Sequence, residues 1–263
     1  YTTSAIKNYI FKKKGGIITS CLQKNIIQIG NTGFCINTDA LFSLGRKGTK
    51  ILKSMNAQIT NIVPVGSTFM ESWSNLKKEE EPTYDLVYFA GNDMPLFSVQ
   101  KNYMKNYYES LQWLTRFSKE YPDLKIIIKH HSNNKKIDKK EIQIISGTPI
   151  KRLVKGELNN GINHTSYGYG INAKFICTWC STIAYEFISN KKPCYFLDPK
   201  LENNSWLHYE EYNSFVRISS YEQFRKKAID AIFYNKSFIV KNSEDFCLKS
   251  DNVAKNIYVF FKQ

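Results

Sequence analysis

The sequence predicts an α/β fold with parallel sheets, arranged as two Rossmann-like units of which the N-terminal one is incomplete. Short apolar runs rich in β-branched residues alternate with longer segments that have helical patterning. Such runs are typical of buried parallel strands, and their alternation with helices favours an α/β architecture. Residues 74–82 are charged, have no apolar periodicity and end in Pro82, as an exposed linker does. The linker divides the chain in two.

The apolar runs give the expected strands, which are residues 17–20, 25–30, 61–66, 85–91, 124–130, 174–179, 193–198 and 215–219. Helical spacing marks residues 100–120, 181–190, 220–234 and 250–263. In the last of these, Val253, Ile257 and Phe260 or Phe261 lie on one face. We therefore expect a partial N-terminal unit over residues 1–78, a second Rossmann-like domain over 83–245, and a C-terminal segment, 246–263, whose helix packs back on the first unit.

Size and composition exclude several classes of protein. The chain has 263 residues, 42% hydrophobic and 23% charged, which is enough for a substantial core and close to the globular average. It contains no apolar stretch of about 18 residues and no signal-peptide pattern at its start, which favours a cytoplasmic protein. The six cysteines are sparse and lie mostly in apolar runs, as reduced core thiols do. The pair Cys177 and Cys180 has no second ligand pair, so we expect no metal site.

The formal charge of +14 implies anionic partners but does not choose among them. Nucleotide phosphates, nucleic acid and an anionic membrane surface are all compatible with it, and so is a Lys-rich surface without any specific partner. A nucleic-acid-binding protein has weaker support, because the aromatic residues fall mostly inside apolar strands and helix faces and no nucleic-acid motif is present.

The most informative segment runs from the expected strand 174–179 into the expected helix 181–190. Ser181 and Thr182 stand where the helix begins, so a hydroxyl and free backbone N–H groups can bind an anion at the carboxyl end of a parallel strand. Glu186, four residues after Thr182, lies on the same helix face and can reach the hydroxyls of a ribose. An ordinary N-cap followed by a solvent-facing Glu gives the same pattern.

Two further strand ends carry polar residues suited to a ligand. The strand 124–130 runs into Lys129, His130 and His131, whose side chains can bind phosphate or move a proton. Adjacent residues of an extended chain point in opposite directions, so at most one His faces a ligand. After the strand 85–91, Gly91 allows a close backbone approach, and Asp93 places a carboxylate at the cleft. Surface histidines and a plain turn are the alternatives.

In chain order these segments resemble the GT-B glycosyltransferases of capsule and lipopolysaccharide synthesis. The resemblance covers about residues 15–200, and its most specific element is a His motif followed some fifty residues later by a Ser-Thr motif. The most similar groups are the CMP-sugar-using sialyl-, polysialyl- and Kdo-transferases and the related polyol-phosphate polymerases. The segments that carry the resemblance are Gln28-Ile-Gly30, residues 39–45, residues 64–67, Lys129-His-His131, Ser181-Thr182 to Glu186, and Pro193.

The resemblance implies a GT-B-like fold and a glycosyltransferase that needs no cofactor. His131, Ser181 and Thr182 would hold the phosphate and ribose of the donor, with Glu186 nearby. His131 would also act in catalysis, and Asp93 is the candidate general base, although an acidic residue outside this sequence fits that role equally well. Ser132 stands where the family usually has Pro, which leaves the choice between His130 and His131 open.

For the reaction, the resemblance favours transfer of a CMP-linked sugar to a surface glycan or a lipid-linked acceptor, with peripheral contact to the inner face of the membrane. The short first unit is compatible with a fragment that is inactive alone. Three alternatives stay open: a CDP-polyol phosphotransferase, a nucleotide-sugar epimerase of the same fold, and a nucleic-acid-binding protein.

Overall fold

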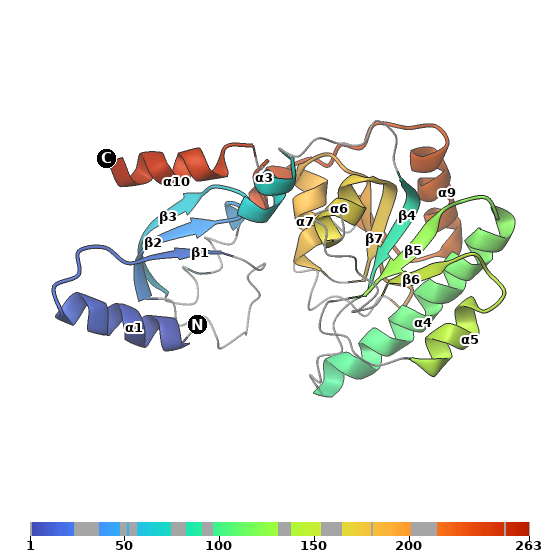
Figure 1. Ribbon diagram of the computed structural model, residues 1–263, viewed down its shortest axis with the longest axis horizontal. Helices are drawn as coiled ribbons and strands as arrows, with labels where there is room; N and C mark the ends of the chain where they lie inside the picture. Colours follow the sequence, from blue (N-terminus) through green and yellow to red (C-terminus); the bar gives the residue numbers. More distant parts are fainter. Residues whose placement is uncertain are drawn as a thin grey trace. The chain divides into compact units, whose positions relative to one another are not determined.

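The computed structural model describes residues 2–23, 37–47, 52, 57–74, 83–90, 97–130, 138–153, 165–179, 181–200, 215–249 and 251–262. The chain divides into two compact units, which we call unit 1 (residues 1–75 and 241–263) and unit 2 (residues 76–240). Each unit is built on its own parallel sheet (Figure 1). Two separate sheets match the expectation of two Rossmann-like units, and no described strand pairs across them.

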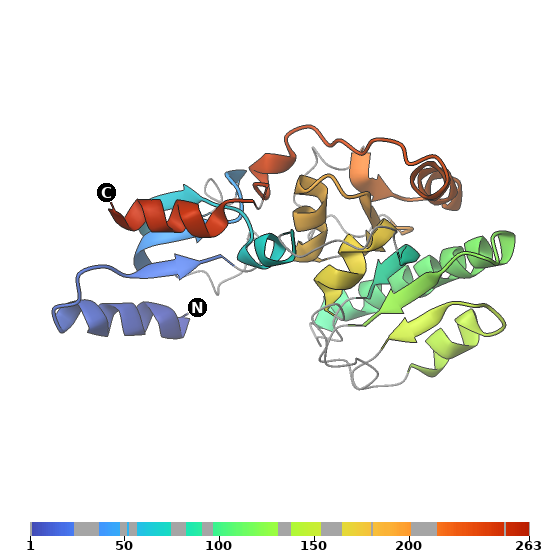
Figure 2. The same ribbon diagram turned by 45° about the horizontal axis from the view of Figure 1, so that its top comes forward.

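Unit 1 has a sheet with the order β1-β2-β3. The strands are β1 (Ser20–Leu22), β2 (Asn37–Ser43) and β3 (Gln58–Pro64), and the helical segments are α1 (Thr2–Lys13), α3 (Thr68–Ser74), η4 (Ser243–Asp245) and α10 (Val253–Lys262). Figures 1 and 2 show α1 and α10 on opposite faces of this sheet. Successive side chains of a strand alternate between faces, so Ala40 and Phe42 point toward α10 while Asp39 points toward α1.

The C-terminal segment packs on unit 1. Val253 is fully buried against Ala40 and Phe42, and Phe260 meets Phe42 edge to face with ring centroids 5.3 Å apart. Before α10, the Leu248 N–H donates to the Leu44 carbonyl over 2.8 Å. These contacts give the amphipathic pattern of α10 a partner within unit 1.

Unit 2 has a six-stranded parallel sheet with the order β6-β5-β4-β7-β8-β9. Numbered from its first strand this is 3-2-1-4-5-6, the order of dinucleotide-binding Rossmann domains. The strands are β4 (Tyr84–Phe89), β5 (Ile126–Lys129), β6 (Lys151–Leu153), β7 (Ala173–Thr178), β8 (Cys194–Leu197) and β9 (Arg217–Ile218). The helices are α4 (Phe97–Glu120), α5 (Lys139–Ile145), α6 (Ser166–Ile171), α7 (Thr182–Ser189) and α9 (Tyr221–Ile232).

Helices cover both faces of the unit 2 sheet, with α4, α5 and α9 on one face and α6 and α7 on the other (Figures 1 and 2). Aromatic contacts match this arrangement: Phe175 of β7 meets Phe224 of α9, and Phe89 of β4 stacks on Phe187 of α7. The core therefore has two layers, one on each face of the sheet.

The elements expected from the sequence correspond to most of unit 2, but the strand β2 and the strand β6 were not expected. Asn37–Ser43 begins with three polar residues and Lys151–Leu153 has two basic ones, so neither reads as an apolar run. The expected strand 17–20 is displaced to Ser20–Leu22. The expected strand 25–30, and most of the expected linker 74–82, lie outside the described residues.

Among the described residues, no helix has both the length and the apolar character needed to cross a membrane. The same part of the chain holds no group of three or more His, Cys, Asp or Glu side chains placed to bind a metal. Cys177 is fully buried in β7, and burial raises the pKa of its thiol well above the ordinary value. Cys180, the other cysteine of that spacing, lies outside the described residues.

Candidate functional site

The strand order of unit 2 locates the candidate site. In open parallel sheets ligands bind beyond the carboxyl ends of the strands, where the strand order reverses. Here the reversal lies between β4 and β7, which are neighbours in the sheet although β5 and β6 separate them in the chain. The Thr178 hydroxyl donates to the Phe89 carbonyl over 2.8 Å and holds the two carboxyl ends together.

Helix α7 begins at this edge of the sheet, directly after β7. Ser181 is its N-cap, with extended backbone angles (φ −161°, ψ 139°), and the serine side chain makes no capping hydrogen bond. The first turn of α7 contains no acidic residue that would neutralise the positive end of the helix dipole. Ser181 and Thr182 are both half-buried. A half-buried hydroxyl not used for capping, beside a helix N-terminus, is an arrangement that suits an anionic ligand.

Glu186 lies one turn into α7 and is 2% exposed. Its carboxylate accepts a hydrogen bond of 2.7 Å from the Tyr167 hydroxyl of α6. This differs from the solvent-facing Glu that the sequence left open as an alternative. A buried carboxylate fixed by a tyrosine has a defined orientation, which is what recognition of a hydroxyl-bearing ligand requires.

Lys129 ends β5 and is a buried cation, 4% exposed. Its ammonium donates to the His130 carbonyl over 2.7 Å, and no carboxylate of the described residues lies within ion-pair distance. Burial lowers the pKa of Lys129. Lys129 and Thr178 both pair in register with Phe89, so all three side chains point to the face that carries α7.

His130 points to the opposite face and is 3% exposed. Its Nε2 atom lies 2.8 Å from Oε1 of Glu141 on α5, and the same oxygen accepts a hydrogen bond from the Arg152 guanidinium of β6. Burial opposes ionisation of Glu141, but the hydrogen bonds from His130 and Arg152 outweigh it and lower the pKa of the carboxyl. The His130 ring is thus part of a buried network between β5, β6 and α5.

The structure brings Lys129, Ser181, Thr182 and Glu186 to the carboxyl edge and the α7 face of one sheet. His131, Gly91 and Asp93, and the Gln28–Gly30 segment of the resemblance, lie outside the described residues. Asp39, in the next segment of the resemblance, lies near the amino end of β2, where it binds Thr19 and Lys12.

Sequence reasoning missed two polar pairs near the site, Tyr167 with Glu186 and Asp198 with Arg217. Asp198 follows β8 directly, is fully buried and forms an ion pair with Arg217 of β9. A charged residue at the end of an apolar run was the available signal for Asp198. Tyr167 had no such signal, because its partner is 19 residues away in the chain and the two meet only through packing of α6 beside α7.

Comparisons with known proteins define the fold. No family model matches the sequence, and a search of the curated proteins gives no match. Among solved structures, UDP-GlcNAc 2-epimerase from Neisseria meningitidis bound to UDP-GlcNAc superposes with a TM-score of 0.58 at 13% identity, over 100% of this chain and 74% of that one. The fold is GT-B-like.

Two other solved structures extend this result. Another UDP-N-acetylglucosamine 2-epimerase gives a TM-score of 0.60 at 11% identity, over 99% of this chain and 76% of that one. S. aureus MnaA, determined with UDP, gives 0.56 at 16% identity, over 86% of this chain and 60% of that one. The chain thus spans about 60% of the length of MnaA. At these identities the likeness shows the fold alone, and it confirms the α/β, GT-B-like class expected from the sequence.

Proposed function

We propose that unit 2 binds the nucleotide of a UDP-linked sugar at the carboxyl edge of its sheet, and that the chain belongs to an epimerase acting on that sugar. The observation that carries the proposal is the α7 N-terminus at the strand-order reversal, beside which the hydroxyl of Ser181 makes no capping hydrogen bond. The three reported neighbours of the same fold are epimerases or were determined with UDP, which favours UDP over the CMP-linked donor first expected.

Each group at the edge has a role in this proposal. The N–H groups of the first turn of α7, with Ser181 and Thr182, bind a phosphate oxygen. The ammonium of Lys129 supplies positive charge on the same face of the sheet, where low dielectric strengthens its attraction to phosphate. The Glu186 carboxylate, oriented by Tyr167, accepts hydrogen bonds from ribose hydroxyls. The catalytic roles of His131 and Asp93, and a phosphate contact from Gly91, stay predictions.

The binding test is calorimetric titration of UDP, CDP and CMP into the wild type and into a Ser181→Ala, Thr182→Ala variant. Hydrogen bonds to a charged group contribute about 1.5–3 kcal/mol each, so the double variant should lose about tenfold or more in affinity for UDP. Because Ser181 makes no capping bond, the Ser181→Ala change itself should alter thermal stability little. Equal UDP affinity in the two proteins would remove α7 from the site.

Ser220→Ala is the matched control. Ser220 is the N-cap of α9, and its hydroxyl does accept a hydrogen bond from the Gln223 N–H, over 3.3 Å. This substitution should cost about 1 kcal/mol of stability and leave the affinity for UDP unchanged. The two variants therefore separate loss of a ligand contact from loss of a helix cap.

The second candidate function is a glycosyltransferase, favoured by the His and Ser-Thr motifs of the sequence. Incubation with UDP-GlcNAc alone in D2O separates the two reactions. An epimerase that inverts C2 must remove and return the C2 proton, so the product should carry deuterium at that carbon. A transferase gives no C2 exchange and consumes the donor only when an acceptor is added.

A further inference from the structure

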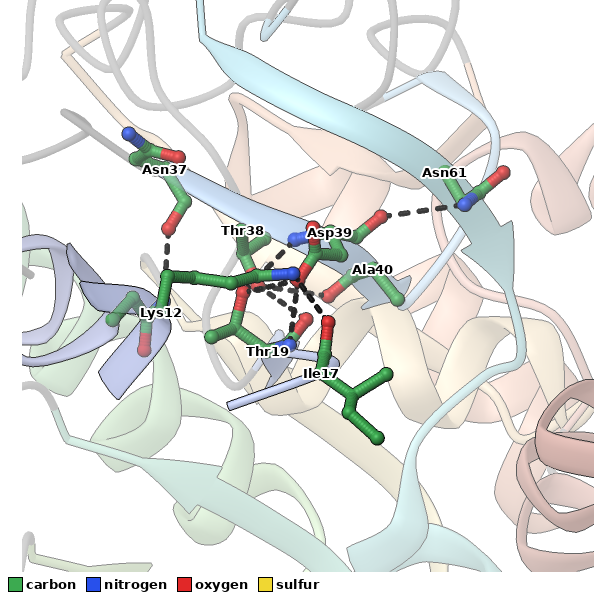
Figure 3. A network of polar contacts seen from close by, with 9 residues as sticks. Lys12, Ile17, Thr19, Asn37, Thr38, Asp39, Ala40 and Asn61 are labelled. Atoms are coloured by element: carbon green, nitrogen blue, oxygen red, sulfur yellow. Dashed lines mark hydrogen bonds and ion pairs between the residues drawn. The ribbon is translucent and has the colours of Figure 1, made fainter. Parts of the chain in front are cut away.

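Helix α1 contacts the sheet of unit 1 through its polar side chains. The Asn8 amide donates to the Asn37 carbonyl over 2.8 Å. The Lys12 ammonium lies 3.0 Å from the Asp39 carboxylate and also donates to the Ile17 carbonyl. Figure 3 shows Lys12 reaching from α1 into this network around Asp39 and Thr19. Asn8 and Lys12 are four residues apart, so they mark one face of α1 as the face that meets the protein.

Three apolar side chains of α1 lie on the helix face opposite Asn8 and Lys12 and are exposed. Ile6, Tyr9 and Ile10 have the spacing i, i+3, i+4 that places side chains on one helix face, and they are 61%, 60% and 48% exposed. On an ordinary amphipathic helix this stripe is the buried one. In α1, therefore, polar side chains face the sheet of unit 1 and apolar side chains face outward. A contiguous exposed apolar stripe marks a surface that binds another partner.

Lysines lie beside the stripe and at its C-terminal end. With about 100° between successive residues of a helix, Lys7 lies beside Ile10, whereas Lys13 continues the face of the stripe one turn beyond Ile10, and both lysines are exposed. The Lys13 ammonium lies 5.6 Å from the centre of the Tyr9 ring. Residues 1–38 contain five lysines and no acidic residue. The outward face of α1 is thus apolar over its middle turns and cationic along one side and at its C-terminal end.

We propose that α1 lies flat on an anionic lipid surface, with Ile6, Tyr9 and Ile10 inserted below the headgroups and the adjacent lysines held at the phosphates. An apolar stripe bordered by Lys is the composition of helices that lie in the membrane interface. A second copy of the chain fits less well, since it would bring two cationic faces together. Nucleic acid would leave the apolar stripe without a partner. The proposal stands independently of the nucleotide site of unit 2.

Sedimentation with vesicles tests the proposal on the 263-residue chain. The wild type should sediment with vesicles of equal phosphatidylglycerol and phosphatidylcholine and stay in the supernatant with phosphatidylcholine alone. Each lysine near an anionic leaflet strengthens binding about fivefold, so Lys7→Gln, Lys13→Gln, Lys14→Gln should weaken partitioning roughly a hundredfold. The variant Ile6→Gln, Tyr9→Gln, Ile10→Gln should weaken it by a similar factor, because half-exposed apolar side chains lose their lipid contact.

The matched control replaces exposed apolar residues of unit 2 with Gln, namely Ile142, Tyr234 and Ile239. This control should sediment as the wild type does, and circular dichroism should show the same helix content in all variants. Failure of the wild type to sediment, equal binding to neutral vesicles, or undiminished binding of either α1 variant would overturn the proposal. So would a dimer in analytical ultracentrifugation that the apolar variant loses while vesicle binding is absent.

Discussion

Glu141 is the centre of the buried polar network beside the candidate site, and replacing it with Ala gives the sharpest test of how unit 2 is held together. Its side chain is 1% exposed, and a single oxygen, Oε1, accepts from both His130 and Arg152. The change Glu141→Ala leaves the guanidinium of Arg152, only 16% exposed, without its carboxylate. A buried charge that loses its partner is strongly destabilising.

The geometry sets the size of the effect. Removing one partner of a buried ion pair costs about 3–5 kcal/mol. Oε2 of Glu141 is buried and makes no hydrogen bond among the described residues, so part of the desolvation cost is uncompensated in the wild type. We therefore expect Glu141→Ala to lower the free energy of unfolding by about 3 kcal/mol, the lower end of this range. For a unit of this size about 1 kcal/mol shifts Tm by roughly 2–4 °C, which gives a decrease of roughly 6–12 °C.

Differential scanning calorimetry measures the change, with Gln143→Ala as the control because Gln143 is an exposed residue of the same helix α5. The control should melt close to the wild type. If Glu141→Ala melts within about 2 °C of the control, the network contributes little to stability and the role assigned to it is wrong.

Two further predictions concern Asp39 in unit 1 and Gly170 in unit 2. The Thr19 backbone N–H, the Lys12 ammonium and the Thr19 hydroxyl lower the pKa of Asp39 from 3.8 to about 2. The stabilisation is therefore complete above pH 3.8 and is lost as the pH falls toward about 2, so urea titrations across this range should show a steeper loss for the wild type than for Asp39→Asn. The change Gly170→Ala would place a Cβ 2.1 Å from the Phe187 ring, and thermal melting should show a loss of about 1–3 kcal/mol as the ring is displaced; an unchanged Tm would show that the ring moves without cost.

The fold was predictable where burial alone selects the residues. The runs that became β4, β5, β7 and β8 are buried over most of their length, so they read as continuous apolar segments. The strand β6 lies at the sheet edge and pairs with β5 alone, which leaves its residues partly exposed and its sequence Lys-Arg-Leu uninformative. Helix α1 was not expected for a related reason. Its residues Ile6, Tyr9 and Ile10 are exposed, so the helix lacks the usual pattern in which one apolar face is buried in the core.

The placement of Ser181 and Thr182 at a helix start was predictable from the sequence, but the side-chain contacts around the candidate site were not. Ser181 and Thr182 at a helix start after a strand are local features, and the structure places them at the start of α7. Glu186 is buried beside Tyr167, which comes from another helix. The His130 ring is held by a hydrogen bond to Glu141 of α5, next to the edge strand β6. Because these partners come from other elements of the chain, the spacing of residues within one element cannot predict the contacts.

Lys129 and His130, adjacent at the end of β5, lie on opposite faces of the sheet and have different surroundings. Alternation along β5 sends Lys129 to the α7 face and His130 to the α5 face. The buried network around His130 therefore fixes the end of β5 from one side, and Lys129 is held in place on the other side without an anionic partner among the described residues. A buried ammonium is costly unless a negative charge compensates it, and a nucleotide phosphate at the same sheet edge would do so. Under the proposed function, the network around Glu141 would act on the site through the position of Lys129.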